Sequence, residues 1–163
     1  MRNPPVAIPC TLRTMTNESP TTTRPVVERS VELDLDVTDA LEAVLRPEIL
    51  SVWLGRWTPG DDDAHATVVT DDGIRRRVDD IARHIDGVSW RWSPDTAHET
   101  DDGAAPDITS DVRITVVPLA GDRSRLTVTE VQASSGAVLD GLAWSICLLA
   151  LEIAAAARAL ASV

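Results

Sequence analysis

The chain has 163 residues, a formal net charge of −11 and 44% hydrophobic residues. That length and apolar content predict one folded globular domain and argue against intrinsic disorder. A surface this acidic repels nucleic-acid phosphates, so no nucleic-acid partner is expected. The two cysteines, Cys10 and Cys147, are too few for a disulfide framework.

Residues 1–25 are predicted to be a flexible N-terminal tail ahead of a single domain at residues 26–163. The tail is rich in Pro and Thr and shows no periodic apolar pattern. No apolar targeting segment precedes Cys10, so we expect a cytoplasmic, bacterial protein.

A strand followed by two short helices is predicted at the start of the domain. Residues 27–37 alternate between apolar and polar side chains, as in a half-buried strand. Thr38 is expected to cap the first helix, and Pro47 suits the first turn of the second. Gly55 is then a natural stop after the second helix.

Five further strands are predicted downstream. Residues 58–63 are expected to form a turn, Asp71-Asp72-Gly73 a hairpin turn and residues 93–106 a long loop. A bulge is expected in the second of these strands, where Val78 and Ile81 break the alternation. The five strands are predicted at residues 64–70, 74–83, 88–92, 108–117 and 125–131.

From Ala137 the apolar period becomes that of a helix. Trp144, Leu148 and Leu151 widen the stripe, which suits a helix lying in the hollow of a curved sheet. Asp140 and Glu152 bracket only eleven uncharged residues, against roughly 20 in a membrane-spanning helix, so no membrane span is expected. The stripe itself comprises Leu139, Leu142, Ile146, Leu149, Ile153, Ala157 and Leu160.

This order of elements resembles the helix-grip fold of the SRPBCC (START-like) superfamily. The resemblance implies an α+β fold, with a curved antiparallel sheet of about six strands around a long C-terminal helix. Within the superfamily, the local sequence is similar to the branch named after the activator of the heat-shock chaperone ATPase. The similar segments are Ala40-Leu41, Pro47-Glu48, Trp53-Leu54-Gly55, Val78 with Ile81, Val88 with Trp90, and residues 124–130. The chain departs from that branch at Gly60-Asp61-Asp62-Asp63, where Gly-Gly is usual, and Trp144 matches only loosely.

The resemblance implies an apolar cavity between the sheet and the C-terminal helix, which would hold a lipid, polyketide or aromatic molecule. For any single apolar residue of this set, ordinary core packing is the alternative. The expected cavity residues are Trp53, Trp90, Trp92, Val112, Ile114, Leu126, Val128, Glu130, Leu142 and Ile146.

Glu130 is the one candidate for catalysis. It follows Leu126 and Val128 on the same side of a strand, where a carboxylate could act as a general acid or base, helped by His84 or Arg113. The alternative is a structural ion pair, for example with Arg113, or exposure to water at the cavity rim.

Other charged groups give weaker signals. Part of Arg75-Arg76-Arg77 could clamp an anionic ligand, although a solvated sheet face that balances nearby Asp residues is the favoured interpretation. The three His residues lack ligand spacing, and Asp61-Asp62-Asp63 lacks the pattern of a calcium loop. Neither a metal nor another cofactor is therefore expected.

Three functions remain open from the sequence. The favoured one is a protein that binds a hydrophobic small molecule; the others are an aromatase/cyclase-like or hydrolase-like enzyme and a chaperone partner. A monomer or a homodimer is expected, because Trp57, Leu148 and Leu151 could leave apolar surface exposed.

Overall fold

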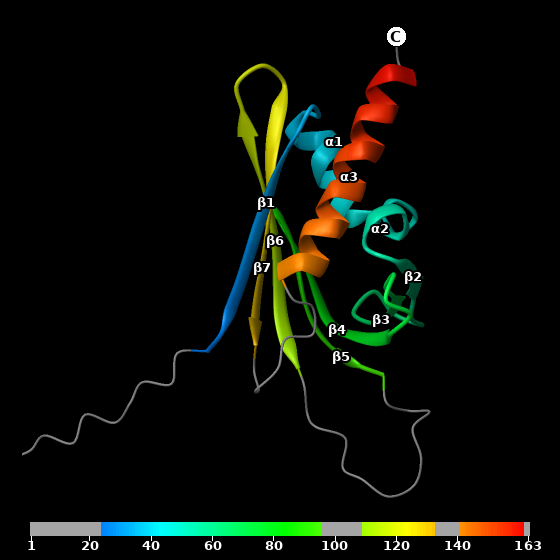
Figure 1. The fold of residues 1–163 in the computed structure, drawn as a ribbon. Helices are drawn as coiled ribbons and strands as arrows, with labels where there is room; N and C mark the ends of the chain where they lie inside the picture. The colour runs from blue at the N-terminus through cyan, green and yellow to red at the C-terminus, as the bar shows by residue number, and fades with distance from the viewer. Residues whose placement is uncertain (1–23, 96–108, 133–140, 162–163) are drawn as a thin grey trace, which may run out of the picture.

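The computed structural model describes residues 24–95, 109–132 and 141–161, with side chains up to residue 157. Within these ranges the fold is α+β, with seven antiparallel strands in the order β1-β7-β6-β5-β4-β3-β2. Helix α3 crosses one face of the curved sheet, and two short helices lie beside it (Figure 1). This is the predicted architecture, with one strand more than expected.

The first strand is shorter than predicted. Strand β1 spans Val26–Leu33 and helix α1 spans Val37–Leu45. Asp36, and not Thr38, caps the helix, because its Oδ1 accepts hydrogen bonds from the backbone N of Thr38 at 2.8 Å and of Asp39 at 2.9 Å. An acidic cap also interacts favourably with the positive end of the helix dipole.

The second helix starts at proline, as predicted. Helix α2 spans Pro47–Trp53, and the Trp53 indole N–H donates to the Ala43 carbonyl of α1 at 3.1 Å. This bond links the two helices. Gly55 follows with φ 130°, and a Cβ there would lie 2.5 Å from the Val69 carbonyl oxygen. Only glycine fits this turn.

The sheet contains a strand that the sequence did not reveal. Strand β2 covers Arg56–Pro59 and pairs with β3, although residues 58 and 59 were predicted to belong to a turn. Four residues are too few to show an alternating pattern. The other strands are β3 (Ala66–Val69), β4 (Arg75–His84), β5 (Gly87–Pro94), β6 (Ser110–Leu119) and β7 (Arg123–Gln132).

The predicted hairpin turn and the predicted bulge of this sheet are both confirmed. The Asp71–Gly73 turn joins β3 to β4, and the β4–β5 register shifts between Asp79 and Ala82. Within the shift Asp80 adopts φ 57°. A bulge of this kind bends a strand and increases its twist, which helps the sheet curve toward α3.

Helix α3 spans Gly141–Ala161 and is rotated relative to the prediction. Its inner face consists of Trp144, Cys147, Leu148, Leu151 and Ala155, which are all buried. Leu142 and Ile146, expected in the cavity, are instead 70% and 52% exposed. Both faces of this helix are apolar, so periodicity alone could not choose between them; the helix buries the bulky indole of Trp144. Among the described helices, none has the length and apolar composition needed to cross a membrane.

Candidate functional site

Four indoles form a continuous row through the interior, which we call the tryptophan row: Trp57, Trp90, Trp92 and Trp144. Successive ring centroids lie 5.6, 6.0 and 5.5 Å apart. Trp90 and Trp92 share one face of β5, because alternate side chains of a strand point the same way. Trp57 extends the row to β2 and Trp144 extends it to α3. The first two contacts are edge-on and the last is stacked, geometries that aromatic pairs favour.

Glu130 anchors the α3 end of the tryptophan row. The Trp92 indole N–H donates to its Oε1 at 3.3 Å, and the Trp144 indole N–H donates to its Oε2 at 2.6 Å. The carboxylate is fully buried, on the interior side of β7 as predicted. Two indole donors supply part of the hydrogen bonding that a buried carboxylate requires. Glu130 therefore holds the stacked pair in place across the gap between sheet and helix.

The expected helpers of Glu130 lie elsewhere. Arg113 forms an ion pair with Asp86 at 2.7 Å, and the His84 Nε2 is 2.8 Å from the Ser89 hydroxyl. Arg113 cannot face the interior, because its strand neighbours Val112 and Ile114 are buried there and alternate residues point to opposite faces. The alternative of an ion pair between Glu130 and Arg113 is thus wrong.

One of the three consecutive arginines points inward. The Arg76 side chain is only 2% exposed and forms an ion pair with Asp72 at 2.7 Å. Its guanidinium lies 5.7 Å from the centre of the Trp92 ring and also donates to the Thr70 hydroxyl. The Arg76 hydrogen bond holds the pKa of the Asp72 carboxyl well below its usual range. Arg75 and Arg77 are exposed, in keeping with the alternation of strand residues.

A small pocket lies at the other end of the tryptophan row, between the helix pair and strands β2, β4 and β5. Its volume is about 70 Å³, below the roughly 300–1,000 Å³ of drug-sized sites. Trp57 and Trp90 form part of its wall. The apolar residues that complete the wall are Val44, Leu45, Pro47, Leu50, Pro59, Ile81 and Val88, and the polar ones are Asp62, Asp63, His65 and Arg83.

Trp90 carries a buried donor that lacks an acceptor. The residue is 3% exposed, and its indole N–H has no hydrogen-bond partner in the described part of the chain. Leaving a buried N–H unpaired costs free energy, so natural structures rarely tolerate it without a reason. Trp53, Trp92 and Trp144, by contrast, all donate from their indole N–H groups.

The polar residues of the pocket include one coupled acid–base pair. The His65 Nδ1 lies 2.6 Å from the Asp62 Oδ1, and its Nε2 lies 3.7 Å from Asp79. The hydrogen bond to Asp62 raises the pKa of His65 above its usual 6.5. The same bond lowers the pKa of Asp62. The imidazole therefore keeps its proton to a higher pH than a free histidine does.

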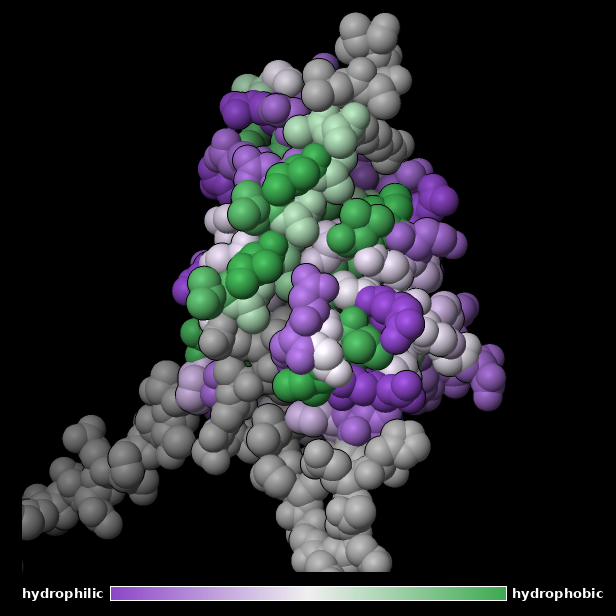
Figure 2. Space-filling view, turned by 45° about the vertical axis from the view of Figure 1, so that its right-hand side comes forward, coloured by the Kyte–Doolittle hydropathy of each residue, from purple (hydrophilic) through white to green (hydrophobic). Residues whose placement is uncertain are grey.

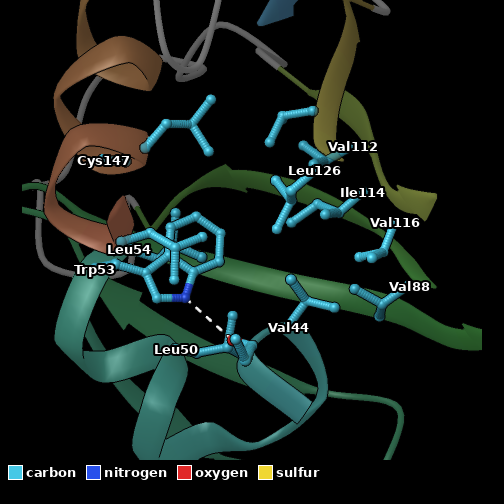
Figure 3. Close-up of a cluster of buried hydrophobic side chains, with 14 of the residues drawn as sticks. Val44, Leu50, Trp53, Leu54, Val88, Val112, Ile114, Val116, Leu126 and Cys147 are labelled. Carbon is cyan, nitrogen blue, oxygen red and sulfur yellow. Dashed lines mark hydrogen bonds between the residues drawn. The ribbon is translucent and has the colours of Figure 1, made fainter. Parts of the chain in front are cut away.

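The predicted cavity residues divide into two groups. Eight are at most 3% exposed, but Leu142 and Ile146 lie on the outer face of α3. Of the ten, only Trp90 lines the pocket. Figure 3 shows Val112, Ile114 and Leu126 extending from the sheet toward the side occupied by Trp53 and Leu54. The eight buried residues are Trp53, Trp90, Trp92, Val112, Ile114, Leu126, Val128 and Glu130.

Sequence reasoning did not identify Trp57 or His65 as site residues. Trp57 precedes the residues assigned to a turn, and His65 shows no spacing to another potential ligand. Both residues lie close in sequence to Asp61-Asp62-Asp63, and this proximity was the one sequence feature that could have pointed to them. Within the described ranges, no three His, Cys, Asp or Glu residues group as a metal site would require.

Comparison with known proteins supports the fold. No protein-family model and no curated protein matches the sequence. A START superfamily protein from Mycobacterium smegmatis matches with TM-score 0.57 and 13% identity, over 82% of this chain and 98% of that one. CalU16 from Micromonospora echinospora matches with TM-score 0.56 and 16% identity, over 80% and 83%. The chain thus has the START-like helix-grip fold.

A third structure comes from a biosynthetic locus. DynU16, a protein in the dynemicin biosynthetic locus, matches with TM-score 0.60 and 21% identity over 78% of this chain. The match covers 45% of DynU16, so this chain spans less than half the length of that protein.

Proposed function

We propose that this protein binds a hydrophobic small molecule of lipid, polyketide or aromatic type, and that the ligand enters at the pocket beside the helix pair. The observation that carries the proposal is a mainly apolar pocket whose wall includes Trp90, a residue whose buried indole N–H has no partner among the described residues. Apolar walls with a few placed polar groups are typical of ligand sites. The START-like fold and the likeness to a protein of a biosynthetic locus support it.

The ligand that fits best carries a hydrogen-bond acceptor on an apolar ring. A carbonyl oxygen that reached the buried Trp90 N–H through a shift of the pocket wall would accept from it and remove the cost of the unpaired donor. Trp57, edge-on to Trp90, would pack against the ring. At about 70 Å³ the pocket holds only part of a larger molecule, so a polyketide-sized ligand requires the helix pair to move away from the sheet.

A matched pair of ligands tests this proposal. Calorimetric titration with 1-tetralone and with tetralin compares one bicyclic skeleton with and without a carbonyl acceptor. We expect the ketone to bind about 2- to 10-fold more tightly, the range of one neutral hydrogen bond. Equal affinities for the two compounds, or no binding by either, would contradict a hydrogen bond from the Trp90 N–H to the ligand.

Two indole variants locate the effect. Trp90→Phe keeps an aromatic ring but removes the donor, so it should abolish the preference for the ketone. Trp57→Phe alters the same pocket wall without touching that donor and should keep the preference. A preference that survives in Trp90→Phe would contradict the proposed contact.

We further propose that the chain belongs to the heat-shock-ATPase-activator branch of this fold, because of the similar segments at Ala40-Leu41, Pro47-Glu48 and Trp53-Leu54-Gly55. In the structure these residues build the helix pair and its packing; Ala40, Trp53 and Leu54 are buried. They are therefore architectural and predict no chaperone contact by themselves. A pull-down that recovers no chaperone would agree with ligand binding as the main function.

A further inference from the structure

The outer face of α3 carries a ridge of large apolar side chains. Leu142, Ile146, Leu149 and Ile153 are 70%, 52%, 56% and 62% exposed. Figure 2 shows hydrophobic surface running along this helix. Four such residues in one line form a contiguous patch, unlike the scattered exposed apolar residues of an ordinary surface.

The ridge has the spacing of a helix-packing seam. Its members are separated by four, three and four residues, the repeat that keeps one stripe facing a neighbouring helix. The opposite face of α3 already packs in the core through Trp144, Leu148 and Leu151. The ridge therefore takes no part in the described core and is available to a second surface.

Small side chains beside the ridge allow a second helix to approach α3 closely. Ala143, Ala150 and Ala157 run along one side, and small side chains let two helices come near each other. Ser145 and Glu152 lie on the other side, in a groove of about 330 Å³ between α3 and β1 that also contains Arg29. Among the α3 residues whose side chains are described, Glu152 is the one charged residue beside the ridge.

Arg29 and Glu152 are complementary charges at opposite ends of this groove. The Arg29 Nε donates to the Gly141 carbonyl at the start of α3, and Glu152 lies eleven residues further on, about 16 Å along the axis. Neither side chain has an ion-pair partner within the described residues.

We propose that the ridge binds a second copy of this chain, with the two α3 helices antiparallel about a two-fold axis near residues 147 and 148. This arrangement places Leu142 against Ile153 of the other copy and Ile146 against Leu149 of the other copy. It also brings each Glu152 to the end of the groove that holds the other copy's Arg29. A parallel arrangement would leave these charges at different heights.

Analytical ultracentrifugation of the full chain tests the dimer. We expect a dimer with a Kd of about 10 µM or tighter, an affinity within reach of a small, mostly apolar interface. Ile146→Glu should raise the Kd at least about 100-fold, because it places two charges in the seam. Ile85→Glu, at a site that is 98% exposed in the β4–β5 turn, is the matched control and should remain dimeric.

Circular dichroism melts would show that both variants are folded. A wild-type chain that is monomeric at about 200 µM overturns the proposal. So does a chain whose ridge binds phosphatidylcholine vesicles and not a second copy, with binding lost in Ile146→Glu.

Charge reversal tests the antiparallel order. Arg29→Glu and Glu152→Arg should each weaken the dimer roughly 10-fold, since each dimer contains the contact twice. The double variant Arg29→Glu/Glu152→Arg should recover most of the loss. Additive losses without recovery would overturn the antiparallel arrangement.

Discussion

Glu130 shows how a residue suited to catalysis can instead serve the architecture. Its two carboxyl oxygens accept from Trp92 and Trp144, one indole on the sheet and one on the helix. The alternation of the strand was enough to predict that Glu130 faces inward. The indole partners were not predictable, because they depend on which side of α3 turns toward the sheet.

We expect Glu130→Gln to destabilise the protein by about 1–3 kcal/mol. The amide offers one acceptor oxygen, and its NH₂ group would face the N–H of the other indole, leaving that donor unpaired. Urea unfolding followed by tryptophan fluorescence measures the change. Glu130→Asp is a control for charge. Aspartate keeps both acceptor oxygens, but its shorter side chain does not reach both indole N–H groups. A Glu130→Gln variant as stable as the wild type would contradict the anchoring role.

The charge of His65 should depend on its contact with Asp62 as the pH changes. Asp62 raises the pKa of His65, so the charged imidazole favours the folded state. This stabilising contribution is complete below the ordinary His pKa and is lost as pH rises through the raised one. Asp62 itself has a lowered pKa, so its own contribution is lost only at acidic pH, as pH falls through that value.

Proton NMR titration of the His65 ring provides the measurement. The wild type should titrate above pH 6.5, and Asp62→Asn should lower the midpoint. A midpoint that Asp62→Asn leaves unchanged would show that the contact in the structure does not control the imidazole.

At the scale of elements, the sequence predicted the strands with clear alternation and the proline-initiated helix α2. It missed β2, which has only four residues. It also inverted the rotation of α3, because Leu142, Ile146, Leu149 and Ile153 form as regular an apolar stripe as the buried side. Two equally apolar faces carry no signal for which one the core uses.

The start of α1 offers a sharp test of an element boundary. Asp36→Ala should cost about 0.5–2 kcal/mol, because it removes the side chain that accepts from two backbone N–H groups. Thr38→Ala, at the cap position predicted from sequence, should change stability far less. Chemical denaturation of both variants compares them directly. A larger loss of stability in Thr38→Ala than in Asp36→Ala would support Thr38 as the helix cap.

At the scale of the whole molecule, the tryptophan row links the pocket beside the helix pair to the core under α3. The described interior residues along this row are buried, and the pocket at its β2 end is small. Eight of the ten expected cavity residues are buried in this region, and of the ten only Trp90 lines the pocket. Sequence similarity could indicate the fold and an apolar interior, but the space left for a ligand depends on how the side chains pack together.

The sequence prediction of a tail ahead of one domain has its own test. A chain lacking residues 1–23 should unfold at the same temperature as the full chain, within about 2 °C, because that segment is rich in Pro and Thr and has no periodic apolar pattern to contribute to a core. Differential scanning calorimetry of the two chains measures this. A fall of several degrees would place part of that segment in the domain.

The indole N–H region of a ¹⁵N-edited NMR spectrum tests the central claim most directly. The chain has five Trp residues, so each indole N–H can be assigned with single Trp→Phe variants. Titration with 1-tetralone should shift the Trp90 signal downfield as it gains an acceptor, with a smaller shift at Trp57. The Trp53 signal, bonded to the Ala43 carbonyl, should stay in place. A Trp90 signal that does not move at saturating ketone would contradict the account.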